Sequence, residues 1–100
     1  MTVDDYGAWA AGVARVSADD QPDRERLSYL GLGLAGETGE AVEHIKKLLR
    51  DGVWRADDFA DELGDVAYYW AALCVAAGHS PSEVLAASKA KIEGRIAGNK

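Results

Sequence analysis

One helical apolar period, held from residue 27 to residue 48, constrains the fold of this chain more than any other sequence feature. The period continues for about six turns at the spacing of one helix face. Its members are Leu27, Leu30, Leu34, Thr38, Ala41, Ile45 and Leu48. We predict a helix over residues 23–50. It should end at Asp51-Gly52, because glycine tolerates the left-handed backbone that closes many helices.

Three further helices are expected, over residues 3–17, residues 56–77, and residues 81 to about 98. The last is opened by Ser80-Pro81-Ser82-Glu83, a capping box with proline at the first helical position. Residues 18–22 read as a polar loop, and Trp9 and Trp70 as core residues. Alanine is plentiful and no segment alternates with a period of two. The prediction is an all-α, four-helix bundle-like fold, with one domain covering residues 1–100.

Two pairs of carboxylates, Glu37 with Glu40 and Glu62 with Asp65, suggest chemistry. Each pair has a spacing of three, which places both acids on one helix face about a turn apart. Both pairs leave the apolar stripe on the same rotational side. Residue 51, the expected turn, lies midway between the pairs. In an antiparallel hairpin they should therefore face each other at nearly the same height.

Four carboxylates in one volume would repel one another strongly unless protons or cations neutralise them. An all-oxygen donor set suits Mg2+, or Mn2+, rather than Zn2+. A di-iron bundle would use Glu-x-x-His, which neither pair contains. Gly36, Gly39 and Gly64 interrupt the helices, where each costs about 1 kcal/mol relative to alanine. We expect them to leave room for close helix approach, a metal or a ligand. His44 is expected to be a polar boundary residue.

Charge and composition exclude several function classes. The net charge is −6, from 17 acidic against 11 basic residues, which argues against a nucleic-acid polymer as partner. The one cysteine, Cys74, excludes an internal disulfide and fits a reducing, cytoplasmic location. The apolar run over residues 66–77 is shorter than the roughly 20 residues of a membrane span. The first residues do not look like a signal peptide.

Glu-x-x-Glu followed beyond the turn by Glu-x-x-Asp resembles the MazG-like, all-α nucleoside triphosphate pyrophosphohydrolases. The sequence that flanks the two motifs is also similar to that family, and the resemblance covers nearly the whole chain. The matching stretches are residues 33–40, 45–52, 61–66, 68–70 and 91–95.

The resemblance implies Mg2+-dependent cleavage of a nucleoside triphosphate between its α and β phosphates, by a homodimer or homotetramer. Carried over by position, Glu37, Glu40, Glu62 and Asp65 would be the metal ligands. A glutamate of the first pair would accept the proton of the attacking water. Two alternatives stay open: a phosphoribosyl-ATP pyrophosphohydrolase, and a non-enzymatic oligomerising or partner-binding module with a structural cation.

Four further residues are candidates for substrate binding. Lys47 lies on the acidic flank and could meet phosphate oxygens. Tyr69 shares the flank of the second pair and could stack on a base. Lys91 and Arg95 share a helix face, and the resemblance favours phosphate contact over an exposed salt-bridged face. Ser88 stands where the family often has asparagine, which leaves the details of substrate contact open.

Overall fold

Four helices account for most of the residues that the computed structural model describes, namely 1–16 and 23–98. They are α1 (Val3–Val13), α2 (Arg24–Asp51), α3 (Ala56–Ala76) and α4 (Pro81–Gly98). These described residues contain no strand, which confirms the all-α prediction. The predicted end of the first helix, at residue 17, is wrong. Arg15 takes a left-handed backbone (φ 57°), which ends a helix of L-residues. The expected loop over residues 18–22 lies outside the described residues.

Local cap chemistry sets the ends of the longest helix. Asp23 accepts a hydrogen bond from the backbone N–H of Arg26 at 3.2 Å, which satisfies one of the free donors at the start of α2. Gly52 closes α2 with a φ of 71°. The predicted bounds of this helix are therefore correct to within one residue.

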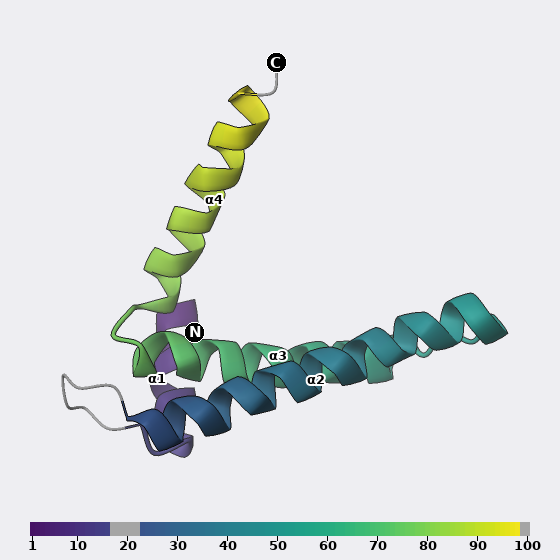
Figure 1. Ribbon diagram of the computed structural model, residues 1–100, viewed down its shortest axis with the longest axis horizontal. Helices are drawn as coiled ribbons and strands as arrows, with labels where there is room; N and C mark the ends of the chain where they lie inside the picture. Colours follow the sequence, from purple (N-terminus) through teal and green to yellow (C-terminus); the bar gives the residue numbers. More distant parts are fainter. Residues whose placement is uncertain (17–22, 99–100) are drawn as a thin grey trace.

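α2 and α3 lie side by side and antiparallel along most of their length, and α1 crosses one end of the pair (Figure 1). α4 projects away from the pair instead of closing a compact bundle. The Cα radius of gyration is 16.0 Å. A compact chain of 100 residues would have about 13 Å. The four helices are those expected, but one copy of the chain forms an open structure. No helix in the described part of the chain is long and apolar enough to cross a membrane.

The buried core is small and consists mainly of alanine. It lies where α1 crosses the start of α2 and the end of α3. Tyr6, Tyr68, Tyr69 and Trp70 pack around it. The core residues are Ala10, Ala14, Leu30, Ala71 and Ala72.

The prediction that Trp9 is a core residue is wrong, because its side chain is 57% exposed. Its ring contacts Tyr6 and Tyr68 only along the outer edge of the core, with centroid distances of 5.6 and 6.1 Å. The buried face of α1 is formed by the small residues Gly7, Ala10 and Ala11, so Trp9 lies beside this face and most of its side chain stays exposed.

α4 is anchored only at its start. Asp4 of α1 accepts hydrogen bonds from the backbone N–H and the hydroxyl of Ser82, at 2.8 and 2.5 Å. These hydrogen bonds lower the pKa of Asp4. Pro81 packs closely on Gly7, where a Cβ would lie 2.6 Å from the proline Cγ. Every residue from 89 to 98 is exposed, so the distal part of α4 has no packing partner among residues 1–16 and 23–98.

Only one glycine of α2 mediates close packing. A Cβ on Gly33 would lie 2.2 Å from Cε1 of Tyr69, so the tyrosine ring occupies the space that a side chain would fill. A Cβ on Gly36, Gly39 or Gly64 would meet nothing within 4 Å. The expectation that these three glycines permit close helix approach is therefore wrong within one copy of the chain. They border open space beside the acids.

We predict opposite effects of alanine at Gly33 and Gly36. Gly33→Ala should lower the free energy of unfolding by about 1–3 kcal/mol, the usual cost of overpacking, because the Tyr69 ring must move. Gly36→Ala should raise it by up to about 1 kcal/mol, because alanine is the better helix former and meets no neighbour. Urea denaturation followed by circular dichroism measures both. Equal effects of the two changes would contradict the packing of Gly33 on Tyr69.

Candidate metal centre

Three acids from the facing helices meet beside the α2–α3 contact. Glu37 and Glu40 of α2 and Glu62 of α3 each offer one carboxylate oxygen, and these oxygens lie within 4.8 Å of one another. Asp65, one turn further along α3, lies outside this group of three. Its negative charge still acts on Glu37. The structure thus brings together three of the four acids expected from the spacing, with the fourth nearby.

The cluster contains carboxylate oxygens without partners. Oε2 of Glu37 and Oε2 of Glu62 are buried, and neither has a hydrogen-bond partner. Burial raises the pKa of Glu37, and the negative charges of neighbouring carboxylates, Glu40 foremost, raise it further. A buried, unsatisfied anionic oxygen is unfavourable, so a proton or a cation bound at this cluster would stabilise it.

Positive charge is scarce around these acids. Among the described residues, no lysine or arginine forms an ion pair with any of the three. The nearest nitrogen partner belongs to His44, whose Nε2 lies 3.7 Å from Oε1 of Glu62. His44 was expected only to be a polar boundary residue, although it follows Glu37 by seven residues and so shares its helix face. That angular position was the available signal for a place at the site.

The donor set fits a hard divalent cation. Three carboxylates from two helices present oxygen atoms toward one volume, two of the carboxylates retain an unsatisfied buried oxygen, and no sulfur ligand is present in the group. Oxygen donors of this kind suit Mg2+ or Mn2+. Glu37, Glu40 and Glu62 could hold such an ion directly, and Asp65 is close enough to contribute charge.

Tyr69 is the candidate substrate residue that lies near the acids. The charge of Glu37 contributes to raising the pKa of Tyr69, after a side-chain hydrogen bond with Tyr29 and burial. The Tyr69 ring meets Tyr29 and Tyr68 edge-on, with centroid distances of 6.3 and 5.2 Å. These contacts hold the ring on the acidic side of the helix pair.

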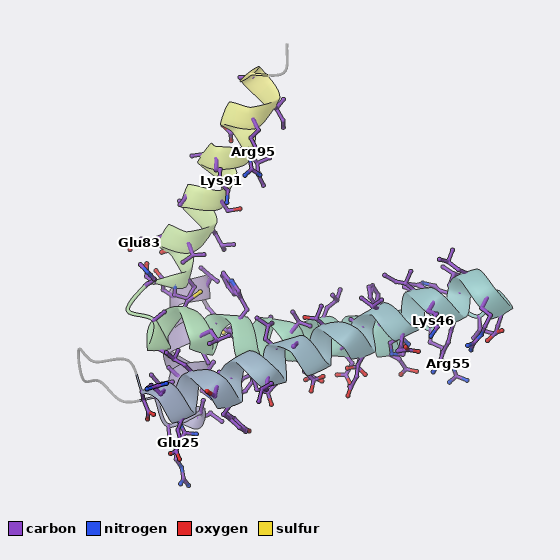
Figure 2. All side chains as sticks on the ribbon, viewed as in Figure 1. Glu25, Lys46, Arg55, Glu83, Lys91 and Arg95 are labelled. Carbon is purple, nitrogen blue, oxygen red and sulfur yellow. The ribbon has the colours of Figure 1, made fainter. Side chains whose placement is uncertain are left out.

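The three basic residues that were predicted to bind substrate do not lie together. Lys47 is exposed on α2, two turns beyond Glu40. Lys91 and Arg95 lie on the projecting α4 (Figure 2). Within the described residues α4 contacts α1 and α3 but not α2. One copy of the chain therefore does not bring Lys91 and Arg95 to the carboxylates. Lys91 and Ser88 instead line a groove of about 650 Å3 at the start of α4.

Removing the charge of Glu37 should stabilise the metal-free protein at neutral pH. A raised carboxyl pKa favours the protonated form, so its contribution to stability is full at low pH and is lost as pH rises through the folded-state pKa. Glu37→Gln cannot ionise. It should melt at a higher temperature than the parent at pH 7 in EDTA, and the difference should shrink toward pH 4.

Added Mg2+ should reverse this order. At a Mg2+ concentration 100 times its dissociation constant, the parent should gain about 2.7 kcal/mol of stability. Glu37→Gln should gain much less. Differential scanning calorimetry across pH and Mg2+ concentration tests both effects. A parent that is more stable than Glu37→Gln in EDTA at pH 7 would contradict the repulsion described above.

Comparison with known proteins identifies the family of this chain. Residues 26–97 match the family described as the MazG nucleotide pyrophosphohydrolase domain. The chain is also 44% identical over 79 residues to the gene 37 protein of Mycobacterium phage L5, covering 73% of this chain and 69% of that protein. No solved structure matches the chain. The family match spans both carboxylate pairs and most of α4, and this chain belongs to the MazG nucleotide pyrophosphohydrolase family.

Proposed function

We propose that this protein is a Mg2+-dependent nucleoside triphosphate pyrophosphohydrolase. It would cleave a ribo- or deoxyribonucleoside triphosphate between the α and β phosphates, releasing the monophosphate and pyrophosphate. The observation that supports this most is the three-acid cluster with two buried, unpartnered oxygens, on Glu37 and Glu62. Such a site is incomplete without a cation, and phosphoryl transfer depends mainly on positioning and charge neutralisation.

The roles of the acids follow from their placement. Glu37, Glu40, Glu62 and Asp65 would hold the metal, with Mn2+ as a possible substitute. When bound, the metal would supply neutralisation of phosphate charge and a more acidic water. We assign proton acceptance to the first pair, Glu37 and Glu40. Both acids lie on one helix about a turn apart, so one could hold the ion while the other accepts the proton.

The other candidate residues would bind the substrate. Tyr69 would contact the nucleoside part of the substrate, since it lies close enough to Glu37 for their charges to interact. Lys47 would approach the phosphates from the far side of Glu40. A cytoplasmic setting, which the single cysteine favours, belongs to the same proposal.

The compounds that the protein hydrolyses distinguish this proposal from the two alternatives. A phosphoribosyl-ATP pyrophosphohydrolase would hydrolyse that compound and leave ordinary nucleoside triphosphates intact. A module with a structural cation would turn over neither.

The direct test incubates the protein with a panel of canonical and modified nucleoside triphosphates and with phosphoribosyl-ATP. Each is assayed with Mg2+, with Mn2+ and with EDTA, and monophosphate and pyrophosphate are quantified. We expect metal-dependent release of both products in equal amounts from at least one triphosphate. Absence of turnover with both metals would overturn the proposed activity.

Glu40→Gln tests the assignment of the acids. It should lower kcat/KM at least about 100-fold, the lower end of what a positioned acid or base contributes. Glu43→Gln is the matched control. Glu43 lies one turn further on the same helix, is exposed and pairs with Lys46 at 3.7 Å, so this variant should retain parental activity. Undiminished activity of Glu40→Gln would show that the acids are assigned wrongly.

We also propose that the protein works as a homodimer or homotetramer. Its core is small, and large apolar side chains are exposed on each of the four described helices. Three of them, Leu85, Ile92 and Ile96, share a face of α4. Lys91 and Arg95 lie beside this face. A second copy that covers this face could bring these cations to the acidic cluster, to which they are complementary in charge. The exposed large apolar residues of α2, α3 and α4 include Val42, Ile45, Leu49, Leu63, Leu85, Ile92 and Ile96.

Light scattering coupled to size-exclusion chromatography should therefore give two or four times the chain mass of 10.6 kDa. Ile92→Glu should shift the protein toward monomer, because it places a charge in the apolar face. Ala90→Glu, on the opposite face of α4, should leave the mass unchanged. A parental protein that is monomeric at micromolar concentrations would contradict this assembly.

A further inference from the structure

The two oxygens of Glu62 have different surroundings. Oε1 lies 3.7 Å from Nε2 of His44. Oε2 is buried and has no hydrogen-bond partner. One oxygen thus faces an imidazole, and the other is free for a further ligand.

Aromatic contacts hold the imidazole in place. The His44 side chain is only 15% exposed. Its ring lies 6.4 Å from the ring of Phe59, and Phe59 in turn packs against Trp54 at 4.9 Å. Phe59 precedes Glu62 by one turn of α3, so the residue that supports the imidazole is on the same helix as the carboxylate that the imidazole faces. This packing restricts the directions in which the His44 ring can turn.

His44 is close to the site without being one of its central donors. The group of mutually close ligand atoms contains oxygens of Glu37, Glu40 and Glu62, and no nitrogen of His44. Nor does any lysine or arginine among the described residues pair with Glu62. Among the described residues, His44 is therefore the one that pairs a nitrogen with this carboxylate.

We propose that His44 is a positioning residue for Glu62: its Nε2–H engages Oε1, so that Oε2 is presented to the cation. The inference rests on the metal site proposed above. The separation of 3.7 Å exceeds a hydrogen bond, which ends near 3.2 Å, so the proposal requires the two side chains to move closer when the cation binds. Partners of this kind orient the carboxylates that bind metals, and their loss typically weakens metal affinity about 10–100-fold.

The test measures Mn2+ affinity by electron paramagnetic resonance, which needs no substrate. His44→Ala should bind Mn2+ about 10–100-fold more weakly than the parent. His44→Gln places an amide nitrogen near the position of Nε2 and should recover most of the affinity. His44→Asn reaches only the position of Nδ1 and should resemble His44→Ala. His79→Ala removes the other histidine, which is exposed and outside the cluster, and should bind as the parent does.

The outcomes separate this inference from the proposed function. A parental protein that binds no Mn2+ would overturn both. A parent that binds Mn2+, with His44→Ala equally tight, would overturn only the role of His44. Electron spin-echo modulation of the Mn2+ form should show no directly bound nitrogen, and a directly bound nitrogen would make His44 a ligand instead. Circular dichroism should show the parental helix content in every variant, and affinity lost equally in His44→Gln and His44→Ala would also contradict positioning through Nε2.

Discussion

The antiparallel pairing of α2 and α3 is the interaction on which the site depends. It fixes the relative height of two acidic segments that are distant in sequence, and it does so against their mutual repulsion. The attraction that opposes this repulsion comes mainly from the crossing with α1, where Leu30, Ala71 and Ala72 are buried. Further along α2, Ala41 is the one buried residue. A cation at the acids would therefore remove a repulsion from the part of the pair that has the least apolar burial.

The alanine-rich core has a related consequence for assembly. Small residues let α3 approach both α1 and α2 closely, but they bury little apolar area. The larger apolar side chains lie instead on outer faces, and α4 is joined to the rest mainly through Pro81 and through Asp4 with Ser82. Within one chain, folding thus leaves the distal face of α4 available. This is the surface that a second copy would cover in the proposed assembly.

The parts of the structure that depend on local chemistry could be predicted from the sequence. The start of α2 follows from the side-chain cap at Asp23, and its end from the backbone freedom of Gly52. The convergence of Glu37, Glu40 and Glu62 follows from helical spacing and from the position of the turn. Each of these rests on residues within a few turns of one another, or on one antiparallel register.

Features set by tertiary packing could not be predicted. The helical period does not say which part of an apolar stripe will find a partner, so the exposure of Trp9 was missed. It also does not distinguish Gly33, which accommodates the Tyr69 ring, from Gly36, which meets nothing. The contact of His44 with Glu62 depends on the rotation of two helices by a few tens of degrees. The direction of α4 depends on a proline packed on a glycine of another helix.

The gradient of burial along the hairpin has a consequence for its motions. The buried residues gather at the α1 crossing, whereas the segments near the turn, from residue 42 through Ala60, have no fully buried side chain. Opening free energies in a protein follow the local density of buried contacts. Backbone amides near the turn should therefore exchange with solvent through local fraying, and those at the crossing only through global unfolding. The acidic cluster lies at the boundary between these two regions. A bound cation would join the two helices there and extend the slowly exchanging region toward the turn.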